Sequence, residues 1–394
     1  MPTQRIAFVC PRFSEGGTIG GAETLIKNLA LRAASAGRSV SLLTTCAQDH
    51  FTWENSVPPG RKKFGAIEVE YFPVDATRDV ATFLRVQASI DQGVPLTRDE
   101  ELAWIRNSVN SAALIAHLRS ANYDRVVAGP YLFGITYAAC EADPGRTLLV
   151  PCLHDENFAY LGIMKELFAS AAGFLFNTEP ERDLAKRLYG VPDAKCAVVG
   201  MGLDPFDADP AAFARRRGIT SPYVIYSGRR ETLKGTPILV EYMNAFRART
   251  EKDVKVVFTG SGPIDAPDDL RPHVIDLGFV SEEEKHEAMA GALAFVHPSV
   301  NESLGIVLLE AWLAGTPALV HAKSNVLSWQ CRRSGGGLWF RHYPEFEEEL
   351  SLLLGNENLR RAMGAAGRDY VLREYAWPAV ERRLLEAVDG LCDL

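Results

Sequence analysis

Short apolar runs alternate with longer segments of helical period along most of this chain. The runs of the first half lie at residues 6–10, 40–46, 67–74, 124–128, 147–153 and 173–176. A second series begins at Tyr223 and continues at 255–259, 274–280 and 293–297. Strands that alternate with helices form largely parallel sheets with helices on both faces. The pattern therefore predicts a doubly wound α/β fold.

Length and composition narrow the class further. The 394 residues exceed the roughly 250 to 300 at which a single core stops growing, so we expect two domains. Both halves are net acidic and the total charge is −8, which argues against a nucleic-acid partner. Seven scattered cysteines without C-x-x-C spacing indicate a reducing compartment. With no signal-like or membrane-spanning run, we expect a cytoplasmic protein, and leave open peripheral contact with the inner face of a membrane.

Residues 304–314 form an apolar segment of helix length that carries one charge, Glu310. A buried carboxylate needs a hydrogen-bonding partner or loses its charge. The neighbouring sequence offers no partner, so we expect either a ligand with hydroxyl groups or a basic side chain from elsewhere in the fold. A structural ion pair is thus one interpretation of Glu310.

The turn before that segment follows the strand at 293–297, and contains Glu302, Ser303, Leu304 and Gly305. A strand that leads into a helix N-terminus through a glycine is a place where phosphate oxygens can approach the backbone. Glu302 would repel phosphate, so it is expected to face hydroxyl groups beside it, with a helix-capping carboxylate as the alternative.

Three other sites follow predicted strands. The loop 11–23 has paired glycines, including Gly20 and Gly21, but lacks the G-x-G-x-x-G fingerprint of dinucleotide-binding proteins. His154 follows the run at 147–153, at the strand end where ligands of open α/β sheets bind; a histidine bonded to nearby backbone is the alternative. Gly228, Arg229 and Lys234 occupy a strand-to-helix turn, where two cations can hold a diphosphate or pair with surface acids.

Further segments carry weaker signals. Thr178 and Glu181 are spaced as a capping box that opens a helix to Leu188, and Ser281 and Glu284 repeat the pattern. The D-x-D at 207–209 lies in an Ala- and Asp-rich linker with no strand before it, so we assign it no metal. Residues 50–106 are predicted to be mainly a solvated loop region, with an acceptor-facing or membrane-facing surface as the alternative.

The segment HPSVNESLGIVLLEAWLAGTPALV, with G-G-A-E at 20–23 and G-R-x4-K-G at 228–235, resembles the retaining glycosyltransferases of family 4, also called group 1. Ser303 and Leu304 stand where that family more often has Gly-Phe. The resemblance implies the GT-B fold, with two facing Rossmann-like domains. It places the first domain at 1–204 and the second at 205–377. A C-terminal helix at 378–394 would cross back to the first domain.

The same resemblance implies a role for each site residue. Glu302 would hold hydroxyls of the donor sugar, Glu310 those of the nucleotide ribose, and His154 would lie near the anomeric carbon. The set that would contact the donor diphosphate or base is Arg229, Lys234, Gly20, Gly21, Gly228, Ser303, Leu304, Gly305 and the backbone at Val280.

The resulting prediction is an enzyme that moves a hexose-type sugar from a nucleoside-diphosphate sugar to an acceptor hydroxyl, with retention and without a metal or other cofactor. The acceptor would be a glycan, a lipid or a small molecule. Two alternatives remain, a non-catalytic nucleotide-sugar-binding protein and, less favoured without the glycine fingerprint, a nicotinamide-dependent oxidoreductase.

Overall fold

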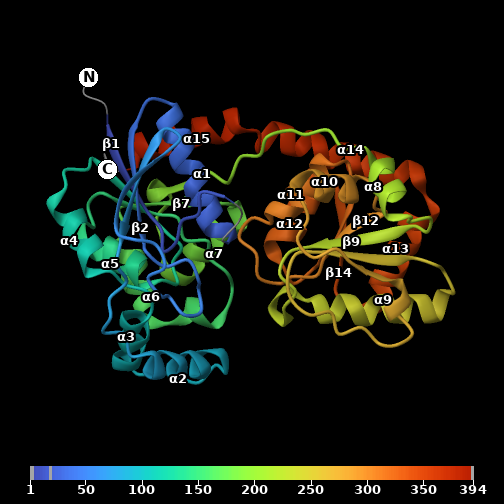
Figure 1. The fold of residues 1–394 in the computed structure, drawn as a ribbon, viewed down its shortest axis with the longest axis horizontal. Coiled ribbons are helices and arrows are strands. Elements are labelled where there is room, and N and C mark those ends of the chain that lie inside the picture. Colours follow the sequence, from blue (N-terminus) through green and yellow to red (C-terminus); the bar gives the residue numbers. More distant parts are fainter. Residues whose placement is uncertain (1–3, 17–19, 392–394) are drawn as a thin grey trace. The chain divides into compact units, whose positions relative to one another are not determined.

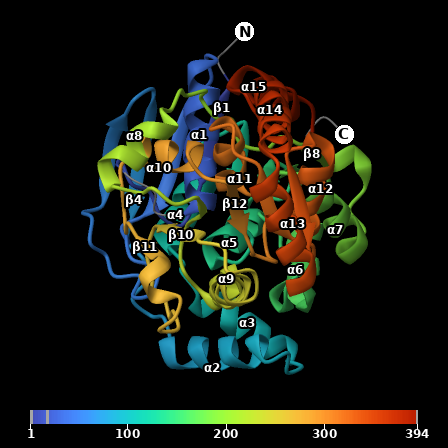
Figure 2. The same cartoon turned by 90° about the vertical axis from the view of Figure 1, so that its right-hand side faces the viewer.

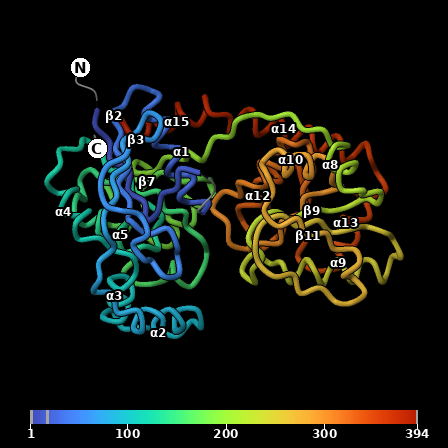
Figure 3. Tube along the Cα trace, in the orientation of Figure 1, coloured from blue at the N-terminus to red at the C-terminus, as the bar shows by residue number. Residues whose placement is uncertain are grey.

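The computed structural model describes residues 4–16 and 20–391. Gly17 of the first glycine-rich loop and Cys392 lie outside the described residues. The chain divides into two compact units: Met1–Met201 together with Val380–Leu394, and Gly202–Ala379. Figure 3 traces how the C-terminal segment returns to the unit that holds the N-terminal strands.

The first unit is built on a sheet of eight strands within the described residues, in the order β3-β4-β2-β1-β5-β6-β7-β8. All neighbouring strands are parallel except β3 and β4. The strands are β1 (Arg5–Val9), β2 (Ser39–Thr45), β3 (Gly60–Phe64), β4 (Ile67–Phe72), β5 (Arg125–Ala128), β6 (Thr147–Leu149), β7 (Gly173–Phe176) and β8 (Cys196–Val198). The helices are α1 (Gly21–Ser35), α2 (Val80–Asp91), α3 (Arg98–Asn107), α4 (Ala112–Ser120), α5 (Gly134–Ala142), α6 (Gly162–Ser170) and α7 (Glu179–Tyr189), followed at the C-terminus by most of α15 (Trp377–Gly390).

The second unit has a six-stranded parallel sheet, counted over the described residues, in the order β11-β10-β9-β12-β13-β14. Its strands are β9 (Tyr223–Ser227), β10 (Lys255–Thr259), β11 (Val274–Asp276), β12 (Ala294–His297), β13 (Ala318–His321) and β14 (Gly337–Phe340). Its helices are α8 (Pro210–Arg217), α9 (Thr236–Thr250), α10 (Glu282–Ala290), α11 (Ile306–Leu313), α12 (Asn325–Ser334), α13 (Tyr343–Gly355) and α14 (Glu357–Glu374).

Each sheet is covered by helices on both faces, which confirms the doubly wound α/β prediction. In the second unit, Met243 of α9 and Leu350 of α13 belong to one apolar cluster with Val224, Val256 and Val296 of the central strands. Figure 1 shows α10 and α11 on the side of the strands opposite to α9. Burying these apolar side chains between layers is the main stabilising contribution, at about 25 cal/mol per Å² of apolar surface.

The prediction of a solvated loop over most of residues 50–106 is wrong. Apart from the expected strand there, this region holds β3, α2 and α3, and Figures 1 and 2 both show α2 and α3 side by side. Trp104 of α3 is buried against Phe83 of α2, with ring centroids 6.2 Å apart. The signal for α3 was present in the sequence, because Thr97 and Glu100 form a complete capping box at its first turn.

Two predicted strands end earlier than expected. The run 147–153 is a strand only to Leu149, and the run 274–280 only to Asp276. After Leu149 apolar residues continue because the loop itself is buried, as Leu153 shows at 1% exposure. After Asp276 the apolar residues lie in a loop that reaches solvent, where Phe279 is 85% exposed. Apolar character alone therefore overestimated the strand lengths.

Candidate active site

Two strand ends of the second unit lie next to each other and bring two loops together. Strands β9 and β12 pair in parallel, so the loops that follow Ser227 and His297 leave the same edge of the sheet. Gly235 in the first loop has φ of 72°, and a Cβ there would lie 2.5 Å from the carbonyl oxygen of Pro298 in the second. Only glycine permits this approach.

That approach places Lys234 against Glu302. The Lys234 Nζ lies 2.7 Å from Glu302 Oε1, and His297 Nε2 lies 3.4 Å from the same oxygen. The side chains of Glu302 and His297 are only 13% and 3% exposed. Burial opposes the charge of this carboxylate, but Lys234 and His297 hold the pKa of Glu302 well below its ordinary value. Glu302 is thus an ionised acceptor at a strand end.

Glu302 does not cap the helix that follows it. Helix α11 begins at Ile306, its N-cap is Gly305, and the cap receives no side-chain hydrogen bond. Gly305 has φ of 81°, and a Cβ there would lie 2.7 Å from Leu327 Cδ2, so the turn requires glycine. Leu304 is 4% exposed, and Ser303 lies between it and Glu302. The capping interpretation of Glu302 is therefore wrong, while backbone binding by 303–305 stays a prediction.

Glu310 has an internal cation as its partner. Lys285, on α10, places its Nζ 3.0 Å from Glu310 Oε2 and 2.7 Å from Glu282 Oε2. Burial disfavours the charged ammonium and lowers its pKa, but the two carboxylates outweigh this effect and raise the pKa of Lys285 above its ordinary value. This is the second of the two partners expected for Glu310, a basic side chain from elsewhere in the fold. Nothing in the sequence pattern marked Lys285, because a lysine on a Glu-rich helix normally indicates a solvated face.

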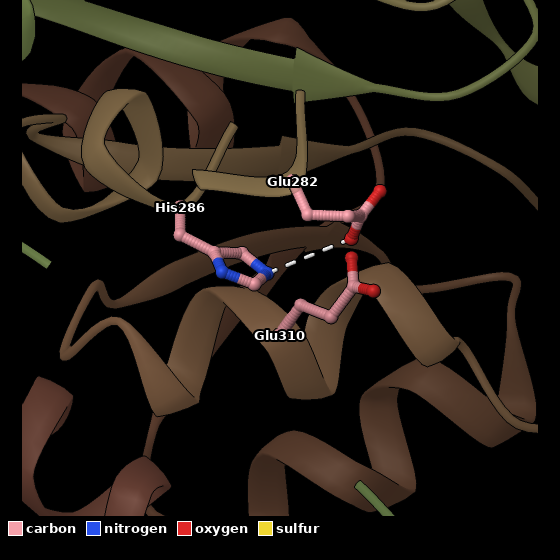
Figure 4. A group of neighbouring side chains, drawn as sticks. All are labelled: Glu282, His286 and Glu310. Atoms are coloured by element: carbon pink, nitrogen blue, oxygen red, sulfur yellow. Dashed lines mark ion pairs between the residues drawn. The ribbon is translucent and has the colours of Figure 1, made fainter. Parts of the chain in front are cut away.

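Three potential metal ligands gather at the same place. Ligand atoms of Glu282, His286 and Glu310 lie within 4.8 Å of one another, the one such group within residues 4–16 and 20–391 (Figure 4). The Lys285 ammonium already contacts both carboxylates, so it supplies the positive charge that a metal would bring. We therefore assign this cluster to an ion-pair network rather than to a metal.

The other predicted contacts of the second unit follow β9 and β11. Arg229 is 56% exposed at its side chain and pairs with Glu231 at 3.1 Å, so it and Lys234 have different partners. Gly228, with φ of 139°, lies against Gly260, where a Cβ would be 2.2 Å from the Gly228 carbonyl oxygen. Val280 lies just before Ser281, the N-cap of α10.

Arg230, which no sequence pattern marked as a site residue, is 7% exposed. Its guanidinium donates to the Gly262 carbonyl at 2.6 Å and to Asp276 at 2.7 Å. These bonds fix the turn after β9 to the turn after β10 and to the last residue of β11. In the D-x-D at 207–209, Asp209 is the N-cap of α8 and accepts the Ala211 N–H at 2.8 Å.

In the first unit, the glycine-rich loop leads into α1. Gly20 is the N-cap and Gly21 the first residue of this helix. A Cβ on Gly20 would lie 2.4 Å from Glu23 Oε2, so a side chain there would have to displace the Glu23 carboxylate. Glu23 is buried and accepts from Arg12 Nε at 3.0 Å, which closes the loop with an internal ion pair.

His154 lies in the loop after β6. Its side chain is 27% exposed, and Nδ1 lies 3.5 Å from Glu156 Oε1, an atom that also accepts the Tyr131 hydroxyl at 2.7 Å. Among the described residues, no backbone group forms a hydrogen bond with the His154 ring, so the alternative of a histidine bonded to backbone is wrong. Its predicted role near an anomeric carbon stays a prediction.

Known proteins resemble this chain in sequence and in fold. Residues 211–370 match the family described as "Glycosyl transferases group 1". A D-inositol 3-phosphate glycosyltransferase of Xylanimonas cellulosilytica is 26% identical over 245 residues, covering 56% of this chain and 58% of the relative. The chain spans little more than half the length of the curated relatives that it matches.

Solved structures match along nearly the whole chain. Sucrose-phosphate synthase from Thermosynechococcus elongatus has a TM-score of 0.72 and 15% identity, covering 98% of this chain and 99% of that one. Anabaena HepE in complex with UDP and glucose has a TM-score of 0.65 and 15% identity, with 98% and 99% covered. The chain therefore has the GT-B fold, and its residues 211–370 form a domain of the group 1 glycosyltransferase family.

Proposed function

We propose that this protein transfers a hexose-type sugar from a nucleoside-diphosphate sugar to the hydroxyl of an acceptor, with retention of configuration and without a metal. The observation that carries the proposal is the pairing of Lys234 with the buried, ionised Glu302 at adjacent strand ends of the family domain. The pair sets an ammonium next to a carboxylate. We infer that the ammonium would contact the donor phosphate and the carboxylate the sugar hydroxyls.

The reaction breaks the bond between the anomeric carbon and the diphosphate oxygen, and the electron pair stays on the diphosphate. The acceptor hydroxyl oxygen forms the new bond to the same carbon, and its proton passes to the departing diphosphate. Charge therefore grows on the leaving group in the transition state. Lys234, Arg229 and the backbone of 303–305 would stabilise that charge, as fixed cations and N–H groups do in other sites.

The sugar and ribose would be held by carboxylates. An ionised carboxylate can only accept hydrogen bonds, so Glu302 would accept from hydroxyl groups of the donor sugar. Glu310 would accept from the ribose. Burial raises the pKa of Glu310, and Lys285 opposes that rise. His154 would lie near the anomeric carbon, where no carboxylate is assigned as a nucleophile, so we favour attack of the acceptor from the same face as the leaving group.

The test is turnover with a panel of UDP-, GDP- and ADP-sugars in the presence of EDTA. Release of nucleoside diphosphate is measured with and without candidate acceptors, which include an inositol phosphate because a relative is named for it. We expect one donor to give acceptor-dependent release and a product of retained anomeric configuration. Tight binding of a donor without turnover would instead support a binding protein, and strict dependence on added Mg²⁺ or Mn²⁺ would contradict the metal-free proposal.

A further inference from the structure

The backbone just before His154 adopts an unusual conformation. Cys152 has φ of 52°, in the left-handed region that residues with a Cβ rarely occupy. It lies three residues after the end of β6 and two before His154. A strained backbone persists only where its surroundings hold it, and such positions cluster at functional sites.

One buried carboxylate holds this segment. Glu181, in the first turn of α7, is 1% exposed. Its Oε1 accepts the backbone N–H of Leu153 at 2.7 Å, and its Oε2 accepts that of Asn177 at 2.6 Å. The Asn177 side chain in turn lies 3.6 Å from Cys152 Sγ. Glu181 thus ties the loop after β6 to the loop after β7.

The carboxylate does more than cap its own helix, although the Thr178 backbone is among its hydrogen-bond partners. The Thr178 side chain is the N-cap of α7 and accepts the Glu181 N–H at 3.3 Å. Among residues 4–16 and 20–391, no basic side chain forms an ion pair with Glu181. A carboxylate buried without a cation is costly, so a site that needed only stability would be better served by an apolar residue. Here the carboxylate connects directly to the residue before His154.

We propose that Glu181 is a positioning residue for His154, which holds the Leu153 backbone so that the imidazole stays in its reactive position. The proposal rests on the role of His154 in the proposed function. It goes beyond that function because it assigns a task to a buried residue whose sequence pattern indicated only helix capping.

The chain offers a matched control. Glu101 is also buried in the first unit, at 8% exposure, and its carboxylate accepts two backbone N–H groups, those of Gly162 at 3.0 Å and Ile163 at 2.9 Å. These bonds fix the start of α6 rather than the His154 loop. Glu181→Gln and Glu101→Gln therefore disturb the same kind of contact at two different places.

The experiment compares both variants with the wild type in the full chain. Glu181→Gln is expected to lower kcat by about 10-fold or more with little change in the KM for the donor, because misplacing a reacting group affects the transition state more than binding. Glu101→Gln is expected to keep kcat within about 2-fold, although both variants lose thermal stability. Equal kcat values for the two variants would overturn the proposal.

A double variant separates positioning from general destabilisation. If Glu181 acts through His154, adding Glu181→Gln to His154→Ala lowers the residual kcat no further. A further loss of about 10-fold in that background would show that Glu181 acts by another route. Should Glu181→Gln not fold, Asn177→Ala removes the contact with Cys152 and is expected to lower kcat in the same direction; an unchanged kcat there would contradict the proposal.

A measurement that does not need turnover keeps this inference apart from the proposed function. The imidazole Cε1–H NMR signal of His154, assigned by its loss in His154→Ala, should be single in the wild type and in Glu101→Gln, and broadened or split in Glu181→Gln. An identical signal in all three proteins would overturn the positioning role. If no nucleotide-sugar is turned over and the signal still splits only in Glu181→Gln, the proposed function fails while the positioning role stands.

Discussion

Two glutamates, one in each unit, show two ways of keeping a carboxylate beneath a strand end. Glu302 of the second unit contacts the Lys234 ammonium and the His297 ring. Glu181 of the first unit contacts backbone N–H groups. Lys234 and His297 hold the pKa of Glu302 well below its ordinary value, whereas burial raises the pKa of Glu181 to about 8 even though the N–H groups oppose the shift.

The difference shows what each partner can provide. A full positive charge close to the carboxylate offsets the loss of water, while two amide dipoles offset only part of it. A permanently charged carboxylate beside a lysine suits the recognition of hydroxyls next to phosphate. A carboxylate held only by amides is suited to fixing backbone. The predictions that follow test this contrast, beginning with the largest expected effect.

Removing the cation from Glu302 should have the largest consequence. Lys234→Ala is expected to lower turnover by at least about 100-fold, because the leaving diphosphate loses a fixed donor and Glu302 loses its counter-charge. Steady-state kinetics with the donor identified in the panel measures this. Arg249→Ala is the control, since it breaks a surface pair with Glu347 in the same unit, at 2.8 Å. Near-normal turnover of Lys234→Ala would refute the leaving-group role.

Variants of Glu310 and Lys285 test whether this pair is a structural ion pair or part of a ligand site. Lys285→Met alone leaves Glu310 buried without its cation, and we expect a loss of about 3 kcal/mol in the free energy of unfolding. Changing both residues to methionine should recover most of that stability, because an apolar pair replaces a buried ion pair at little cost. Chemical denaturation of the single and double variants gives these values.

The double variant also tests whether Glu310 binds the ribose. If Glu310 binds the ribose, the stable double variant should bind the donor about 10-fold more weakly, the loss expected for one or two hydrogen bonds to a charged group. Calorimetry with the nucleoside diphosphate measures the affinity. An unchanged affinity would mean that Glu310 serves the fold alone, and the ribose role would then be wrong.

The contributions of Glu181 and Glu302 to stability should depend on pH in opposite directions. The pKa of Glu181 is raised to about 8 on folding, so the folded chain binds more protons than the unfolded chain between about pH 5 and 8. Stability from this group therefore falls as pH rises through that window, by at most about 1.4 kcal/mol per pH unit. Glu302, whose pKa is lowered, contributes stability that is lost only as pH falls below its unfolded value of about 4.3.

Denaturation at pH 5.5 and 7.5 tests this sign. Glu181→Gln should remove part of the pH slope, so that the wild type loses stability relative to the variant as pH rises. Glu349, whose pKa burial raises to about 7, contributes equally to both proteins and cancels in the difference. If the stability of the wild type and of the variant changed equally with pH, Glu181 would be ionised from pH 5.5 to 7.5. Its amide partners would then stabilise the charged carboxylate as well as a cation does.

The sequence predicted the fold class and the order of strands and helices better than it predicted which side chains contact one another. Apolar runs and glycines located the strand ends, because burial and backbone conformation leave local signals. Lys285 and Arg230 were missed because an ion pair across the fold leaves no local signal. The partners of Glu181 were missed for the same reason: its spacing from Thr178 pointed to the helix, while its carboxylate contacts Leu153 in another loop.

The smallest expected effect separates the helix cap from the carboxylate that follows it. Thr178→Ala removes the N-cap of α7 and is expected to lower the free energy of unfolding by about 1 kcal/mol. The Glu181 carboxylate keeps its bonds to Leu153 and Asn177, so kcat should stay within about 2-fold of the wild type. Denaturation and steady-state kinetics on the same preparation measure both. If kcat fell as far as in Glu181→Gln, the start of α7 as a whole, rather than the carboxylate, would position His154. The contrast between Glu302 and Glu181 would then concern their pKa values only and not their functions.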